Sequence, residues 1–255
     1  MHAAADGAAP RARGFAAFDR GLALLTDWPA AVLVLLETGI LLAGVVSRYV
    51  FNQPFTWSDE LASILFLWLA MLGAVIALRR GEHMRLTTLV NLMPPRARAW
   101  VETLVTCTVA LFCAALLAPS YEHFQDQWVV TTPALEWHDG VRVAAIGIGA
   151  VLMLAIATAR LLEHAGWKQL LAVLALVAVV GVLAWMAKPM LMKWGNTNLL
   201  LFFVVGVGIG VALGMPIGFA FGLATLAYLA LTTRTPLTIV VSRMDEGMSH
   251  IILLS

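Results

Sequence analysis

The chain has 255 residues, of which 61% are hydrophobic and only 12% are charged. A soluble globular chain carries about 25% charged residues to cover its water-facing surface, whereas the mean hydropathy here is +0.89. Lipid is therefore the expected solvent for most of this surface. The net charge of +1, without a basic patch interleaved with aromatic residues, gives no indication of a nucleic-acid partner.

Long apolar runs predict an all-α polytopic membrane protein that crosses the bilayer about six times. A spanning segment must satisfy its own backbone hydrogen bonds, and runs that are continuous rather than alternating favour helices over a barrel. Each span needs about 20 mostly apolar residues. The predicted spans are 29–49, 57–78, 100–120, 141–162, 170–187 and 198–231.

The last apolar stretch is too long for a single straight crossing. At about 1.5 Å per residue it would reach roughly 50 Å, against a hydrocarbon core of about 30 Å. Gly214-Met215-Pro216 interrupts it, because proline removes a backbone donor and clashes with the preceding turn. One strongly kinked helix and a hairpin of two short helices both remain open. The glycines of this stretch, at small-xxx-small spacing, predict close helix packing.

The N-terminal region precedes the first span. An Ala-rich polar tail is followed by residues 14–28, in which an apolar stripe recurs at helical spacing: Phe15, Phe18, Leu22 and Leu25. Such a segment predicts an amphipathic helix in the headgroup plane. The apolar run after it exceeds the length of a cleavable signal segment, about 7–15 residues, so the first span is expected to be retained.

Lysines and arginines in the short loops predict the orientation. They precede the first span, crowd the loop after the second span and follow the fourth span, whereas the loop 121–140 carries four acidic residues and no basic one. Positive charge marks the cytoplasmic side. The N-terminus is therefore expected in the cytoplasm and the acidic loop outside.

A short polar segment separates the first two spans. Pro54 fixes its own backbone and biases the preceding residue to an extended form, so a tight turn is expected after Asn52. Thr56 is expected to cap the next helix, with Asp59 completing a capping box. Carboxylates in a first turn also interact favourably with the helix dipole.

Two charged positions near or within the spans have specific expected roles. A charge near the membrane is costly unless it pairs, so Arg48 is expected to pair with Glu60 or Asp59 across the turn and clamp the two spans. Glu37 lies about 12 Å into the first span. We expect a structural role for it, protonated or hydrogen-bonded to a threonine of the third span (Thr103 or Thr106), while a proton or cation relay is the functional alternative.

Enzymatic alternatives find little support. The two cysteines lie six apart on one apolar run, which argues against a disulfide, and there is no Walker loop, serine elbow or zinc-ligand cluster. A membrane cytochrome anchor would need histidines facing each other inside the bundle. Four histidines instead lie at or beyond span ends: His83, His123, His138 and His164. No catalytic residue, metal or resident cofactor is predicted.

The segment from Arg48 through Trp57-Ser58-Asp59-Glu60, followed by a basic turn that ends in His83, resembles the small membrane subunit of tripartite ATP-independent periplasmic (TRAP) transporters. In that family an arginine–aromatic pair, an Asn-x-Pro turn, a Trp-Ser-x-Glu helix start and a basic turn ending in histidine occur in this order. The stretches 214–220 and 243–248 resemble the opening of the large subunit.

The resemblance implies a domain organisation and partners. Residues 1–28 would form the tail and interfacial helix, 29–165 a four-helix small-subunit domain, 166–197 a connecting helix and 198–255 the truncated start of the large subunit. The implied function is import of organic acids, usually driven by Na⁺ at sites outside this chain, with a periplasmic binding protein and the remaining large-subunit polypeptide as partners in the bacterial inner membrane. Arg48, Asn52, Trp57 and the acidic loop would form an outward docking surface. The alternative is a non-transporting scaffold or cytochrome-type anchor.

Overall fold

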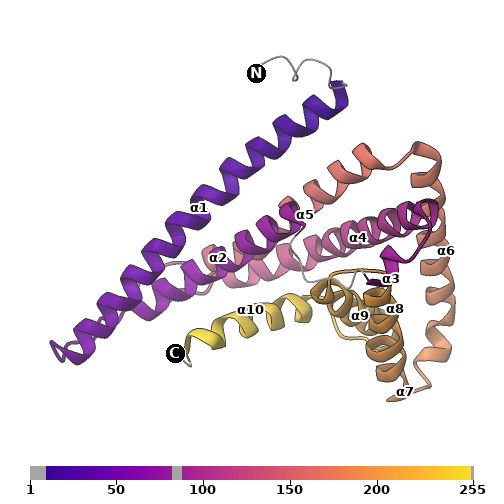
Figure 1. The fold of residues 1–255 in the computed structure, drawn as a ribbon. Coiled ribbons are helices and arrows are strands. Elements are labelled where there is room, and N and C mark those ends of the chain that lie inside the picture. The colour runs from indigo at the N-terminus through magenta and orange to yellow at the C-terminus, as the bar shows by residue number, and fades with distance from the viewer. Residues whose placement is uncertain (1–9, 82–87, 254–255) are drawn as a thin grey trace, which may run out of the picture. The chain divides into compact units, whose positions relative to one another are not determined.

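The computed structural model describes residues 10–81 and 88–253, and it is built from helices (Figure 1). In chain order these are α1 (Pro10–Tyr49), α2 (Ser58–Arg80), α3 (Thr88–Asn91), α4 (Pro95–Trp128), α5 (Gly140–His164), α6 (Trp167–Leu191), α7 (Thr197–Leu199), the π-helix η1 (Leu200–Gly206), α8 (Val207–Ala212), α9 (Ile217–Thr232) and α10 (Thr238–Leu253). Within these ranges the only extended pairing is one isolated bridge between Thr131 and His138. The predicted all-α membrane fold is confirmed.

Five of the described helices are long and apolar enough to cross a membrane: Ala17–Tyr49, Ser58–Arg80, Pro95–Trp128, Gly140–Glu163 and Trp167–Leu191. Over the predicted sixth span the chain forms two shorter apolar helices, Thr197–Ala212 and Ile217–Thr232. At 16 residues, α9 reaches about 24 Å, less than a hydrocarbon core of about 30 Å.

The structure decides between the two alternatives for 198–231 in favour of a hairpin. Gly214 has φ +78°, a conformation that glycine adopts without steric cost. The amide of Met215 donates to the carbonyl of Gly210 at 2.9 Å, and Pro216 immediately precedes α9. The predicted break at Gly214-Met215-Pro216 is therefore a turn that lays α9 against η1 and α8.

The predicted separation of an interfacial helix from the first span is not observed. α1 is a single helix of 40 residues that continues through Pro29. Leu22 of the predicted apolar stripe is buried, but Leu25 is 67% exposed, and the polar Thr26 is fully buried. The buried face of this segment therefore differs from the one that residue hydrophobicity indicates.

The third span extends well beyond its predicted end at residue 120. α4 runs from Pro95 to Trp128 and contains Pro119, so the loop expected from residue 121 begins only after Trp128. Acidic residues such as those at the end of α4 are typical of a loop, but a helix that leaves the membrane keeps its backbone hydrogen bonds in water and can carry them equally well.

The start of the second helix corrects a local prediction. α2 begins at Ser58, its N-cap position is Trp57, and no side chain makes a cap hydrogen bond there. The expected Thr56 cap and capping box are therefore wrong. The hydroxyl of Ser58 instead donates backward to the carbonyl of Phe55 at 2.9 Å. Asp59 and Glu60 do lie in the first turn of α2, where the helix dipole favours them.

The helices form two compact units. The first contains α1, α2, α4 from Ser120, α5 to Leu152 and α10 from Ser242. The second contains α3, the remaining parts of α4 and α5, and α6 to α9. These units reflect contacts in space, and the predicted domain boundaries along the chain remain a prediction.

In the second unit, α4, α5 and α6 share an apolar core of small and branched side chains: Cys107, Ala110, Ala157, Leu161 and Val173. Small residues let helices approach closely in lipid. Gln169, near the start of α6, donates to the carbonyl of Ala99 and to the hydroxyl of Thr103 at 3.0 and 2.8 Å. The predicted connecting helix is thus bound to α4 by both apolar and polar contacts. Both cysteines of the chain are free.

Candidate interaction site at the α1–α2 turn

The turn between α1 and α2 is ordered by backbone contacts. Asn52 has φ +54°, a left-handed conformation that asparagine tolerates better than most residues. The amide of Gln53 donates to the carbonyl of Ser47 at 3.1 Å, and the buried Ser47 hydroxyl donates to the carbonyl of Gln53. Pro54 follows directly, as the predicted tight turn requires.

Arg48 and Asp59 face each other across this turn. Their closest nitrogen and oxygen lie 3.6 Å apart, and their side chains are 53% and 63% exposed. Of the two predicted partners of Arg48, the geometry selects Asp59. An exposed ion pair of this kind stabilises a fold by about 0–1 kcal/mol, so the predicted clamp is a weak one.

Glu60 has a stronger role, which sequence reasoning missed. Its carboxylate accepts hydrogen bonds from the consecutive backbone amides of Ala134 (2.9 and 3.1 Å) and Leu135 (2.9 Å). Successive amide groups that point at one carboxylate form a small anion-binding nest. The first turn of α2 therefore holds the loop between α4 and α5.

This loop, residues 129–139, has a defined structure. The amide of Thr132 donates to the carbonyl of Trp137 at 2.8 Å, and the amide of Asp139 donates to the carbonyl of Val130 at 2.9 Å. The ring of His138 stacks on Trp128, with centroids 4.8 Å apart. We call segments 48–60 and 129–139 together the turn–loop surface.

The turn–loop surface exposes several large apolar side chains beside its charged groups. Trp57 stacks on Phe55 with ring centroids 5.5 Å apart. The exposed apolar residues of the two segments are Tyr49, Val50, Phe51, Phe55, Trp57, Val129, Val130 and Trp137. Exposed apolar groups rimmed by polar ones mark protein–protein or membrane contacts.

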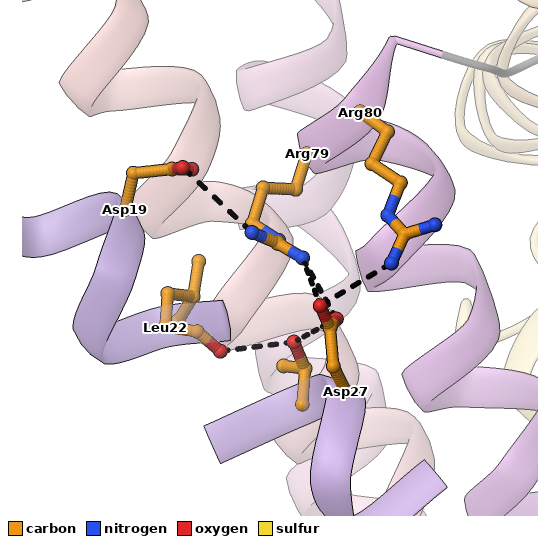
Figure 2. A network of polar contacts seen from close by, with 6 residues as sticks. Asp19, Leu22, Asp27, Arg79 and Arg80 are labelled. Atoms are coloured by element: carbon orange, nitrogen blue, oxygen red, sulfur yellow. Dashed lines mark hydrogen bonds and ion pairs between the residues drawn. The ribbon is translucent and has the colours of Figure 1, made fainter. Parts of the chain in front are cut away.

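A second polar cluster, shown in Figure 2, joins the N-terminal half of α1 to the end of α2. Arg79 Nη2 donates to both oxygens of Asp27 at 2.7 Å, and Arg80 Nη2 reaches one of them at 3.3 Å. Asp19 lies 3.7 Å from Arg79 Nη1. The side chain of Arg79 is only 10% exposed, and these carboxylates therefore stabilise a positive charge that is largely removed from water.

The other predicted residues lie elsewhere. Glu37 is buried in α1. The hydroxyls of Thr103 and Thr106 donate to carbonyls of their own helix at 3.0 and 2.8 Å, so the structure lends no support to the expected bond with Glu37. His83 lies outside the described residues, and the Gly214 turn belongs to the second unit. Among the residues that are described, no three His, Cys, Asp or Glu side chains are grouped to hold a metal ion.

Residues 37–166, about half of the chain, match the family described as tripartite ATP-independent periplasmic transporters, DctQ component. This range contains α2, the Glu60 contact and the loop that Glu60 holds. The chain belongs to the DctQ family.

Curated relatives agree with DctQ membership. The putative TRAP transporter small permease protein of Haemophilus influenzae is 31% identical over 133 residues, which is 52% of this chain and 82% of that protein. The sialic acid TRAP transporter small permease protein SiaQ of Vibrio cholerae is 30% identical over 79 residues, 31% of this chain and 46% of SiaQ. Both relatives are described as small permease proteins of TRAP transporters.

A longer relative matches as well. The sialic acid TRAP transporter permease protein SiaT of Haemophilus influenzae is 41% identical over 85 residues, 33% of this chain but only 14% of SiaT. This chain therefore aligns with a small fraction of SiaT. Membership of the DctQ family and the five long apolar helices indicate a protein of the bacterial inner membrane that is part of a transport system. The curated relatives are described as permease proteins rather than enzymes.

The sequence pattern did not predict one buried ion-pair cluster, which joins the start of α5 to α10. Arg142, in the first turn of α5, pairs with Asp139 at 2.8 Å and with Asp245 of α10. The Asp139–Arg142 spacing of three residues is typical of a helical ion pair and could have revealed half of this cluster. Asp245 lies 103 residues away, so no local pattern indicates that contact.

Proposed function

We propose that this chain is the small-subunit part of a TRAP-type transporter joined to the first piece of its large subunit. In this proposal, 29–165 form the small-subunit domain, 166–197 the connecting helix and 198–255 the opening of the large one. The match to the much longer SiaT and the contacts of α6 with α4 support a fused arrangement. The complete transporter would import an organic acid, and SiaT and SiaQ are named for sialic acid, itself a carboxylate.

The turn–loop surface would be the docking site for the periplasmic binding protein. The observation that carries this proposal is the bonding of Glu60 to the amides of Ala134 and Leu135. These bonds fix two segments into one surface, so that exposed aromatic and charged groups are presented without the entropic cost of ordering a loop on binding. The distribution of lysine and arginine supports placing this surface in the periplasm, with the N-terminus in the cytoplasm.

Reconstituted uptake tests the function. Proteoliposomes would contain this chain together with the remaining large-subunit polypeptide, and purified binding protein would be added outside. We expect uptake of labelled sialic acid or succinate that needs all three components and an inward Na⁺ gradient. Uptake that is unchanged without this chain would refute its role, and uptake that persists without Na⁺ would refute the proposed coupling.

A matched pair of tryptophans tests the docking surface. Trp57→Ala removes an aromatic group from the turn–loop surface. Trp28→Ala removes an exposed tryptophan of α1 that lies outside this surface. We expect Trp57→Ala to weaken binding of the binding protein to the assembled transporter at least tenfold, as loss of an aromatic anchor does. Trp28→Ala should leave this binding unchanged. Equal effects of the two substitutions would contradict the proposed surface.

A further inference from the structure

Most of the surface of α6 is left exposed by the other helices of the second unit. Of its 25 residues, only Val173 and Leu191 are buried. Val173 and Val177 belong to the face that packs against α4 and α5. No charged residue lies between Lys168 and Lys188 in the sequence. The exposed surface of α6 therefore needs an apolar partner, which is either lipid or polypeptide.

One strip of this exposed surface begins and ends with a tryptophan. Trp167 and Trp185 are separated by 18 positions, which is about five turns of an α-helix, so the two residues lie on the same face. Their side chains are 69% and 65% exposed. The residues between them on this face are apolar and exposed: Leu171, Leu174, Ala178 and Val182. We call these six residues the α6 strip.

The length of the α6 strip matches the apolar thickness of a bilayer. At about 1.5 Å per residue the two tryptophans lie about 27 Å apart along the helix, and the hydrocarbon core is about 30 Å thick. Tryptophan is enriched at both membrane–water interfaces, where its ring lies at the level of the headgroups. A surface that packs against polypeptide does not require exposed tryptophans at this distance on one face, whereas a lipid-facing strip is stabilised by them.

A lysine accompanies each of these tryptophans. Nζ of Lys168 lies 5.7 Å from the ring centroid of Trp167, and Nζ of Lys188 lies 4.8 Å from the ring centroid of Trp185. Lysines near the ends of spanning helices extend toward the headgroups. Anionic headgroups attract such lysines, so both ends of the α6 strip carry the charge that complements a phospholipid.

The end of the strip at Trp185 is the better defined of the two. Nζ of Lys188 donates to the carbonyl of Ala230 at 2.9 Å, in the last turn of α9. A helix C-terminus favours a nearby cation, so this contact holds the ammonium group beside the exposed Trp185 ring. An ammonium group has three donors. Lys188 can therefore bind a phosphate oxygen while it keeps the contact with Ala230.

We propose that the α6 strip is a phospholipid-contact face, with acyl chains along its apolar residues and an anionic headgroup bound at Lys188 and Trp185. The occupant is lipid rather than the remaining large-subunit polypeptide, because the strip combines the spacing of a bilayer with positive charge at both ends. The lipid contact rests on α6 and α9 alone. Only the statement that the strip stays uncovered in the complete transporter rests on the proposed function.

Photo-cross-linking from the strip tests its occupant. The full chain carrying Ala178→p-benzoylphenylalanine would be placed in nanodiscs of phosphatidylglycerol and phosphatidylcholine, alone and co-expressed with the remaining large-subunit polypeptide, and its adducts identified by mass spectrometry. We expect phospholipid adducts in both samples. The matched control, Val177→p-benzoylphenylalanine on the packed face, should form adducts within the chain instead.

Two results would overturn the contact face: an adduct between position 178 and the large-subunit polypeptide, or equal lipid labelling at positions 177 and 178. If the two polypeptides do not copurify, the proposed function fails, and the sample of the chain alone still decides the lipid contact.

Lipid selectivity tests the headgroup site. Gly181 has open space around it and lies seven positions before Lys188, about two turns along the same face, so Gly181→p-benzoylphenylalanine samples the lipid at this lysine. We expect an excess of phosphatidylglycerol over phosphatidylcholine adducts that falls about fivefold in Lys188→Gln, as for one lysine at an anionic surface, and that Lys188→Arg retains. Lys168→Gln, at the opposite end of α6, should leave the excess unchanged. The same excess with and without Lys188→Gln would refute the headgroup site.

Discussion

Replacing Asp27 by asparagine removes the charge that Arg79 contacts while preserving the shape of the side chain. Both oxygens of Asp27 accept from Arg79 at 2.7 Å, and Arg79 is 10% exposed whereas Asp27 is 33% exposed. A hydrogen bond to a charged group contributes about 1.5–3 kcal/mol. Because Asp27 is one-third exposed, we expect the lower part of this range, about 2 kcal/mol or roughly 30-fold in the unfolding equilibrium.

The assay for Asp27→Asn is equilibrium unfolding in mixed micelles with increasing dodecyl sulfate, followed by far-ultraviolet circular dichroism. Asp19→Asn is the matched control, because Asp19 lies 3.7 Å from the same arginine and is more exposed. Its expected cost is below about 1 kcal/mol, as for surface pairs. Equal costs for the two substitutions, or no measurable cost for Asp27→Asn, would refute the assignment of Asp27 as the main partner of Arg79.

Three further substitutions test other contacts. Glu60→Ala should raise hydrogen exchange at the two loop amides that it binds by about tenfold or more, through loss of charge-assisted bonds; Asp59→Ala, its neighbour in the same helical turn, should leave these amides protected. Gly222→Ala should cost about 1–3 kcal/mol in dodecyl sulfate unfolding, because the added Cβ would meet an aromatic ring at 2.6 Å, whereas Gly218→Ala, with open space around it, should cost nothing. Gly214→Ala should cost about 1–2 kcal/mol in the same titration, because its φ of +78° is left-handed; an unaltered midpoint would show that the turn relaxes without strain.

The long helices were predictable because the length of an apolar run is a local property of the sequence. All five long spans occur near their predicted positions. The ends of the helices were less predictable. Polar residues such as Glu122 and Asp126 look the same in a loop and in a helix that protrudes into water, so the extension of α4 to Trp128 was missed.

The contacts at the α1–α2 turn were predictable in part, while the choice of these residues as a functional site stays a prediction. Asn52 and Pro54 do form the tight turn, and Arg48 does meet Asp59. The partner of Glu60, however, is a pair of backbone amides 74 and 75 positions away. The sequence does not indicate which main-chain amides a carboxylate will bind, because every residue except proline carries such a donor. Only the tertiary structure could identify them.

That same property gives the Glu60 contact an evolutionary and engineering consequence. The carboxylate recognises the peptide bonds at Ala134 and Leu135 and makes no use of the side chains there. The tip of the loop can therefore change its side chains, and with them the shape and charge offered to a partner, while the anchor stays intact as long as proline is avoided. A library of variants with altered side chains at the loop tip could therefore be screened for partner binding while the Glu60 contact keeps the loop backbone in place.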